Sequence, residues 1–280
     1  MITFFYRSYI RECNYTCSYC PFVKGHYTEK SIQKDREHFN RLIDYIEENS
    51  QEEYGLFLAP RGEIMILEHY FEGIARLLKL KNLKNLVVQS NFSGEIKWLK
   101  DLENKEKFNL WLSFHPEFVT VENFAKKLRI LNDYGINYCA GSVGVKENFS
   151  LLRKLREAVP PENYMWINAY KNIKNYYSPE DIDFLTALDP LFKYNLTDYK
   201  SLGEECSAGY DSFFLEYNGD VRGCFGNMKK LGNIYNDSLK DIAVKIPCKR
   251  KICDCFIGYI NLKKEFLVPL YKNLLARQAY

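Results

Sequence analysis

The distribution of nine cysteines along 280 residues constrains this chain more than any other feature of its sequence. Three cysteines lie near the N-terminus, five lie in the last third, and one stands alone between them: Cys13, Cys17 and Cys20; Cys206, Cys224, Cys248, Cys253 and Cys255; and Cys139. An odd number in a chain of this length does not suit a small disulfide-bonded scaffold. In a reducing compartment, clustered cysteines are typical of metal ligands or catalytic groups. The sequence therefore predicts two metal sites, one in each part of the chain.

The overall composition excludes several other classes of protein. Hydrophobic residues make up 46% of the chain and charged residues 27%, which is typical of a globular protein and not of a disordered one. The net charge of +3 is too small to indicate a nucleic-acid or anionic-membrane partner. No run of 18 apolar residues is present, and Arg7 ends the apolar stretch 2–6 too early for a signal peptide. We expect a cytoplasmic protein that binds neither nucleic acid nor membrane.

The first 180 residues or so alternate between short apolar strands and helical segments. The strands are expected at 2–10, 54–58, 85–88, 110–114, 137–145 and 164–169, and the helices at 31–49, 68–80, 94–102, 121–134 and 151–158. Such alternation predicts an α/β fold with a parallel sheet covered by helices. Six units are too few for a closed eight-stranded barrel, so a partly open barrel and a doubly wound sheet both remain possible. In either fold, ligands bind at the carboxyl ends of the strands.

The pattern changes after about residue 200, which divides the chain into a core, 1–200, and a smaller unit, 201–280. Segments 213–217 and 221–224 are expected to form a β-hairpin around a tight Asn218–Gly219 turn. Residues 231–258 are expected to be irregular, and 260–275 to form a terminal helix.

The first three cysteines form the pattern C-x3-C-x2-C in the loop after the first strand. Soft thiolate ligands select zinc, copper(I) or iron–sulfur clusters. A four-iron cluster normally takes four cysteines, so three would leave one iron open for chemistry. A zinc site is less favoured, because apart from His26 no histidine or fourth cysteine lies near enough in the sequence to complete a tetrahedron.

This pattern, with Tyr19 directly before the last cysteine, resembles the radical S-adenosylmethionine superfamily. The resemblance implies a partial (β/α)6 TIM-like barrel with a [4Fe-4S] cluster on Cys13, Cys17 and Cys20. S-adenosylmethionine would chelate the open iron, and its reductive cleavage would give a 5′-deoxyadenosyl radical that abstracts a substrate hydrogen. Tyr19 would then lie near the adenine.

Other segments at the expected strand ends resemble further motifs of that superfamily. The resemblance assigns Gly62 and Glu63 to the methionyl amine, Ser90 and Asn91 to a polar pair, Ser113 to ribose or carboxylate contacts, and Gly144 and Glu147 to the adenine side. Four residues at strand ends beyond the cofactor are expected to face the substrate: His115, Asn168, Tyr170 and Arg61.

The later cysteines resemble the SPASM/twitch extension of the same superfamily. Cys206-x12-Gly219-x4-Cys224 precedes Cys248-x4-Cys253-x-Cys255, and Gly232-Asn233-Ile234 with Ser238-Leu239 fits the run between them. Five cysteines indicate the shorter twitch form with one auxiliary [4Fe-4S] cluster. The expected ligands are Cys206, Cys224, Cys253 and Cys255, with Cys248 as the substitute. Cys139 is expected to be a buried core thiol.

Together these features predict an oxidoreductase-type enzyme that modifies a peptide or a small molecule and takes electrons from a flavodoxin or ferredoxin. Oxidation, cross-linking and epimerisation remain open as reaction outcomes. Two other classes are alternatives, namely a ferredoxin-like electron carrier and a zinc-binding structural or interaction protein.

Overall fold

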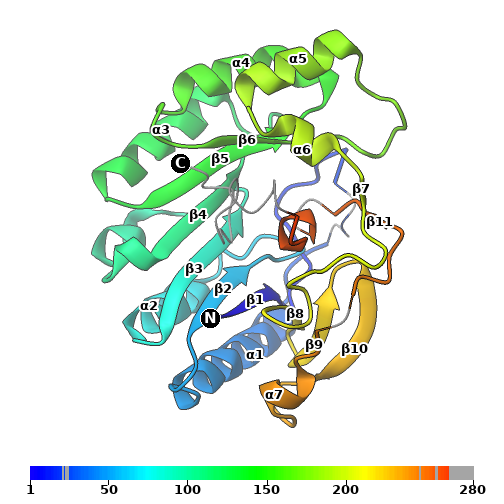
Figure 1. Ribbon diagram of the computed structural model, residues 1–280. Coiled ribbons are helices and arrows are strands. Elements are labelled where there is room, and N and C mark those ends of the chain that lie inside the picture. The colour runs from blue at the N-terminus through cyan, green and yellow to red at the C-terminus, as the bar shows by residue number, and fades with distance from the viewer. Residues whose placement is uncertain (21, 23–24, 246, 256–257, 265–280) are drawn as a thin grey trace.

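The fold is a curved, mostly parallel sheet with helices packed on its outer face (Figure 1). The computed structural model describes residues 1–20, 22, 25–245, 247–255 and 258–264. Parallel strands run in the order β1 to β6: β1 (Ile2–Arg7), β2 (Tyr54–Leu58), β3 (Leu83–Ser90), β4 (Phe108–Ser113), β5 (Asn137–Val143) and β6 (Met165–Asn168). The helices between and after them are α1 (Glu29–Glu48), α2 (Glu68–Lys79), α3 (Val121–Asp133), α4 (Phe149–Ala158), α5 (Pro179–Leu188) and α6 (Phe192–Leu196). The expected partial barrel of six βα units is confirmed.

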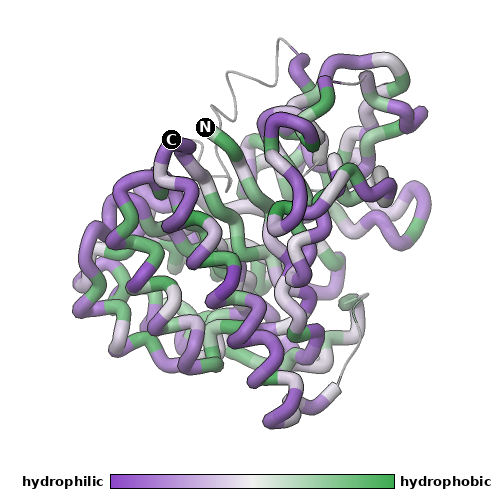
Figure 2. The backbone as a smooth tube through the Cα atoms, turned by 90° about the horizontal axis from the view of Figure 1, so that it is seen from below, coloured by the Kyte–Doolittle hydropathy of each residue, from purple (hydrophilic) through white to green (hydrophobic). Residues whose placement is uncertain are grey.

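The two faces of the sheet carry two separate apolar cores. Phe4 faces the helices and Phe5 faces the barrel interior, because successive side chains of a strand point to opposite faces. Inside the barrel, Trp111 stacks on Phe57 with ring centroids 5.3 Å apart. Cys139 lies in this inner core and is fully buried, as expected. Figure 2 shows hydrophobic residues within the fold and hydrophilic ones along the outer surface.

The C-terminal extension continues the same sheet from the other side of β1. β8 (Ser212–Glu216) pairs in parallel with β1, then β9 (Asp220–Cys224) and β10 (Asn227–Asn233) add antiparallel strands. The expected hairpin is confirmed, and Gly219 turns it at φ +87°. A Cβ at Gly219 would also lie 2.3 Å from the Tyr235 ring, so the turn needs glycine twice over. Residues 231–258 are less irregular than expected, because β10 pairs with β9 through a bulge.

Short elements complete the extension and connect it back to the barrel. They are β7 (Tyr199–Lys200), α7 (Leu239–Ile242), β11 (Ile252–Cys253) and the 3-10 helix Gly258–Asn261. β11 pairs antiparallel with β7, which places Cys253 beside Tyr199, in the segment that follows α6. Residues 265–275 of the expected terminal helix lie outside the described residues.

Two expected elements differ from those observed. β1 ends at Arg7 rather than at residue 10, and the cysteine loop starts there. The expected helix at 94–102 is a 3-10 helix, Lys97–Asp101. Its buried residue Leu99 lies three positions from each of the buried residues that flank the helix, Ile96 and Leu102, which suits three residues per turn. Two further 3-10 helices, Lys105–Lys107 and Lys146–Asn148, fill connections.

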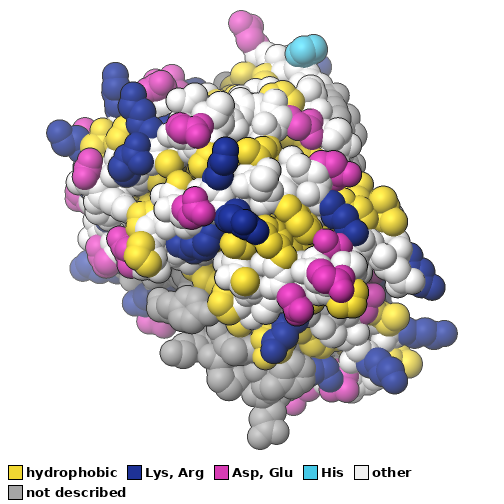
Figure 3. All heavy atoms as spheres, turned by 90° about the horizontal axis from the view of Figure 1, so that it is seen from above, with side chains coloured by type: hydrophobic (Ala, Val, Ile, Leu, Met, Phe, Trp, Pro, Cys, Tyr) yellow, Lys and Arg dark blue, Asp and Glu magenta, His cyan; other side chains and the backbone are white. Residues whose placement is uncertain are grey.

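Charges of both signs are interspersed over the face of the molecule shown in Figure 3. This mixture agrees with the small net charge of the sequence. Within the described part of the chain, no helix has both the length and the apolar character needed to cross a membrane.

Candidate active site

The cysteine loop is fixed against the end of β2 by a close approach of two backbones. The Glu63 amide donates to the Glu12 carbonyl oxygen at 3.0 Å. The Tyr27 hydroxyl lies between both segments, donating to the carbonyl oxygens of Glu12 at 2.9 Å and Glu63 at 2.8 Å. A Cβ at Gly62 would lie 1.6 Å from the Glu12 oxygen, so this approach requires glycine.

The Glu63 carboxylate organises the ends of β2 and β3. It is buried and accepts hydrogen bonds from the Met65 amide at 2.7 Å, the Asn91 amide at 2.5 Å and the Ser90 hydroxyl at 3.0 Å. Burial raises the pKa of Glu63, and these three donors oppose that rise. The side-chain Nδ2 of Asn91 lies 3.6 Å from the Cys13 sulfur. Three of the predicted cofactor residues therefore form one network directly behind Cys13.

The end of β4 holds the other half of the cysteine loop. His115 Nδ1 lies 3.2 Å from the Cys17 sulfur and 2.8 Å from the Tyr19 hydroxyl, and its ring lies parallel to the Tyr19 ring. Burial lowers the pKa of His115 to about 4, so the imidazole is neutral at physiological pH. Ser18 donates to the Glu117 carboxylate from its amide at 3.0 Å and from its hydroxyl at 2.6 Å. His115 thus contacts the cysteine loop itself.

The thiols of this loop are close enough to influence one another. Burial, followed by the nearby Cys20, Glu117 and Cys13, raises the pKa of Cys17 to about 11. Burial also raises the pKa of Cys13, where Glu63 and Cys20 contribute. Within the described residues, no three His, Cys, Asp or Glu side chains are arranged as a metal site. Three neighbouring thiols are nevertheless a soft donor set that fits an iron–sulfur cluster.

The second group of cysteines gathers from four separate segments. The pKa of Cys253 is raised to about 12 by burial and then by Cys255, Cys206, Cys224 and Cys248, so all five thiols lie together. Cys248 is held by its backbone, which donates to the Glu204 oxygen at 3.0 Å and accepts from the Gly203 amide at 2.8 Å. The five thiols again suit an iron–sulfur cluster, and they exceed by one the usual set of four.

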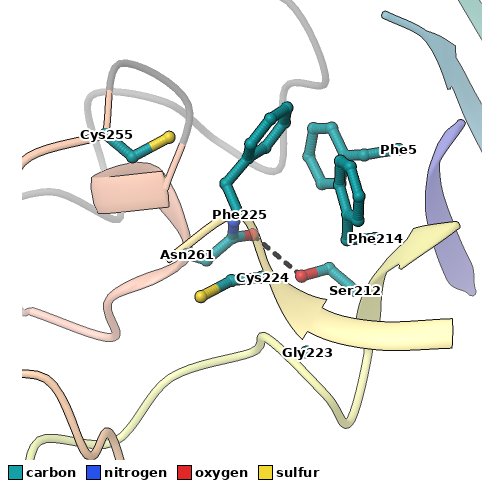
Figure 4. A pocket seen from close by; sticks show the side chains of 8 residues that line it. All are labelled: Phe5, Ser212, Phe214, Gly223, Cys224, Phe225, Cys255 and Asn261. Carbon is teal, nitrogen blue, oxygen red and sulfur yellow. Dashed lines mark hydrogen bonds between the residues drawn. The ribbon is translucent and has the colours of Figure 1, made fainter. Parts of the chain in front are cut away.

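A small pocket of about 20 Å³ separates these cysteines from the barrel interior. Figure 4 shows Cys224 and Cys255 on one side of it and the rings of Phe5 and Phe214 on the other. The Ser212 hydroxyl donates to the Asn261 side-chain oxygen at 3.1 Å across its rim. The cysteine group therefore packs directly on the aromatic lining of the barrel.

A cavity of about 550 Å³ at the carboxyl ends of the strands reaches both groups of cysteines. Its lining includes Cys20 from the first group and Cys255 from the second. Five predicted site residues also line it: Tyr19, Ser113, His115, Asn168 and Tyr170. The structure thus brings the candidate substrate residues of β4 and β6 to one space between the two cysteine groups.

Three other predicted residues lie elsewhere. Arg61 Nη2 lies 3.4 Å from the Glu216 carboxylate and is not among the cavity-lining residues. The Gly144 carbonyl accepts from the Tyr177 hydroxyl at 2.7 Å, and Glu147 is exposed and accepts from Tyr176 at 3.3 Å. Gly144 and Glu147 therefore contact the loop that precedes α5.

The cavity also contains residues that the sequence did not single out, among them Arg7, Trp166, Phe225 and Asp254. The sequence contains a pattern that could have identified Arg7, because this cation directly follows the apolar stretch 2–6. No such pattern identifies the aromatic residues, since an aromatic residue in a strand more often belongs to the hydrophobic core than to a binding site.

Comparison with known proteins agrees with this arrangement. Residues 206–258 match the SPASM family, an iron–sulfur cluster-binding domain, and this match covers all five later cysteines. Among solved structures, native anSMEcpe with bound AdoMet resembles the chain with a TM-score of 0.57 at 16% identity, over 86% of this chain and 80% of that one. SuiB of Streptococcus suis bound to S-adenosylmethionine gives 0.55 at 14% identity, over 87% and 64%. No curated protein matches the sequence.

The chain shares its fold with these S-adenosylmethionine-bound structures, and residues 206–258 match the SPASM iron–sulfur cluster-binding domain. The resemblance seen in the cysteine motifs is therefore confirmed. At these identities the solved structures establish the fold alone. Cys255 of the SPASM-matching segment lines the same cavity as Cys20 of the cysteine loop.

Proposed function

We propose that this protein is a radical S-adenosylmethionine oxidoreductase that abstracts a hydrogen atom from a peptide or small-molecule substrate. The observation that carries this proposal is the single cavity lined by both Cys20 and Cys255. When bound to Cys13, Cys17 and Cys20, a [4Fe-4S] cluster supplies the electron that cleaves S-adenosylmethionine to methionine and a 5′-deoxyadenosyl radical. A neighbour with this fold, anSMEcpe, has been solved with AdoMet and the Cp18Cys peptide.

The residues around the cavity fall into those that would bind S-adenosylmethionine and those that would bind the substrate. Glu63, with Ser90 and Asn91, presents a buried acceptor beside Cys13 that suits the methionyl amine. Tyr19 and Ser113 line the cavity where adenosine is expected, and His115, Asn168 and Tyr170 line its substrate part. Aromatic walls exclude water, which protects a reactive intermediate from side reactions.

The SPASM domain has a separate role in this proposal. Cys206, Cys224, Cys253 and Cys255 would bind one auxiliary [4Fe-4S] cluster that aids oxidation of the substrate. Cys248 is the substitute ligand if one of these four does not bind. Residues 1–200 then form the core that cleaves S-adenosylmethionine, and 201–280 form the auxiliary unit. Solvent-accessible thiolate ligands suit a reducing, cytoplasmic environment, where a flavodoxin or ferredoxin would supply electrons.

The test is replacement of Cys13, Cys17 and Cys20 together by alanine. Formation of 5′-deoxyadenosine from S-adenosylmethionine and dithionite should fall to background, whereas Cys139→Ala should retain it because Cys139 lies in the inner core. Cofactor cleavage by the triple variant at the wild-type rate would refute the site. Clusters without any cleavage in the wild type would indicate a ferredoxin-like carrier, and zinc alone would indicate a structural zinc protein.

A further inference from the structure

Arg7 is a buried cation in the cavity wall at the end of β1. Its side chain is 5% exposed, and its guanidinium lies 4.0 Å from the centre of the Phe225 ring. Nη1 donates to the carbonyl oxygens of Ala59 and, at 3.0 Å, of Pro60. Within the described residues, Nε has no hydrogen-bond partner. The side chain is therefore held rigidly by one nitrogen while another donor is unused.

In the part of the chain that the structure describes, Arg7 forms no salt bridge with a carboxylate. The nearby Glu216 pairs with Arg61, at 3.4 Å. Burial and then the nearby Arg61 lower the pKa of Arg7 to about 9, against the opposing effect of Glu216 and Cys255, so the guanidinium is still positive at neutral pH. A buried charge is costly unless it is paired. Glu216 therefore faces two nearby arginines and pairs with Arg61.

The other residues that line the cavity also bear on what kind of ligand it would bind. Its other charged lining residues are already paired, Lys171 with Asp198 at 3.0 Å and Asp254 with Arg250 at 3.1 Å. The buried Trp166 Nε1 is a second donor without a partner among the described residues. Trp111, Phe114, Trp166 and Phe225 supply apolar walls. Among the residues that the structure describes, the cavity thus offers two hydrogen-bond donors without a partner, Arg7 Nε and Trp166 Nε1, and a guanidinium without a salt bridge, on an aromatic surface.

We propose that Arg7 binds a carboxylate of the substrate, so that the molecule modified in this cavity is a carboxylic acid with an apolar or aromatic body. This inference rests on the proposed function and adds the substrate class to it. The methionyl group of S-adenosylmethionine is a different ligand, because its expected acceptor Glu63 lies at the ends of β2 and β3 beside Cys13. Arg7 lies instead beside Phe225 and Cys255, on the side of the SPASM domain.

The test compares an acid with its neutral amide. The reconstituted wild-type protein, saturated with S-adenosylmethionine, is titrated anaerobically with 4-fluorophenylacetate and with 4-fluorophenylacetamide, and binding is followed by the 19F linewidth. The acid should bind at least about tenfold more tightly, because a charge-assisted hydrogen bond to a buried guanidinium is replaced by a neutral one. Equal binding would mean that Arg7 serves only to balance the thiolates of the SPASM domain, and would overturn the proposal. Loss of acid binding on adding S-adenosylmethionine would also overturn it, because Arg7 would then hold the cofactor.

Variants assign the preference to Arg7. Arg7→Gln should remove the preference for the acid, and Arg7→Lys should retain part of it because the charge remains. Arg156→Gln is the matched control, since Arg156 also donates to two successive carbonyls, of Val159 and Pro160, but lies outside the lining residues. If Arg7→Gln does not fold, the acid–amide comparison in the wild type still decides.

A second pair of probes identifies the source of the carboxylate. Acetyl-Phe-Glu-amide and acetyl-Phe-Gln-amide place the acid on a peptide, and tighter binding of the former than of fluorophenylacetate would assign a peptide substrate. The reverse order would assign a free acid. The binding assay needs no turnover, so its failure is distinct from failure of the proposed function, which is measured by 5′-deoxyadenosine.

Discussion

The two cysteine groups face the same cavity but are positioned in opposite ways. The first has three cysteines within one loop, and the ends of β2, β3 and β4 hold that loop through Glu63, Asn91 and His115. The second has five cysteines from four segments, and they are joined by short pairings such as β7 with β11 and by the backbone of Cys248. The strand ends of the barrel position the first site, whereas the second is assembled from the short strands β9 and β11 and the loops beside them.

Because the two cysteine groups are positioned differently, metal binding is expected to contribute more to the stability of the second group than to that of the first. Cys17 is buried in the wall of a fold that has a large core of its own. The cysteines of the SPASM domain are brought together by short strand pairings and backbone hydrogen bonds, so metal binding there contributes folding free energy as well as chemistry. We expect disturbance of the first site to abolish cofactor cleavage, and disturbance of the second to loosen the extension.

The largest expected effect is that of Gly62→Ala, which tests whether the barrel prepares the first site. The added methyl group would collide with the Glu12 carbonyl and push the cysteine loop away from β2. Bound iron should fall from about eight to about four per chain, with loss of 5′-deoxyadenosine formation. Gly25→Ala is the control in the same loop, because its Cβ would meet Glu12 at an ordinary 3.5 Å. Full iron content in the Gly62 variant would show that the close approach is dispensable.

The second prediction concerns the choice of ligands in the SPASM domain. Cys253→Ala should lose about four irons and lower the melting temperature, while the spectrum of the first cluster and uncoupled cofactor cleavage persist. Cys248→Ala should keep about eight irons, because the other four thiols complete the site. Iron analysis and thermal unfolding measure both. The opposite pattern would make Cys248 the ligand in place of Cys253.

The smallest expected effect is that of Glu117→Gln at the rim of the first site. Glu117 accepts from Ser18, and this exposed contact adds little to a loop that is already fixed on its buried side. Cofactor cleavage should change by less than about threefold, measured under saturating S-adenosylmethionine. A loss as large as that of Gly62→Ala would place the control of the loop at β4 instead of β2.

The sequence predicts those features that depend on local pattern. Short apolar runs predict the parallel strands, and the Asn218–Gly219 turn predicts the hairpin, because each is determined by residues close together in the chain. Cys13, Cys17 and Cys20 share a loop, so their spacing alone indicates a common site. The grouping of Glu63 with Ser90 and Asn91 follows from their positions at neighbouring strand ends.

Other features depend on long-range packing, which spacing does not encode. β8 joins the barrel sheet through β1, more than 200 residues earlier in the chain, and no local pattern indicates this pairing. Arg61 and Arg7 both stand at strand ends, yet Glu216 from the extension pairs with Arg61 and leaves Arg7 in the cavity. The backbone bonds that bring Cys248 to Glu204 are equally remote from its spacing pattern.

The most direct test of the account is electron paramagnetic resonance of the anaerobically reconstituted and reduced wild-type protein, with iron and sulfide counts. The account predicts about eight irons per chain and two cluster signals, of which S-adenosylmethionine changes one, because only the three-cysteine site has an open iron. That signal should disappear in the variant lacking Cys13, Cys17 and Cys20. About four irons per chain, or two signals that S-adenosylmethionine leaves unchanged, would contradict it.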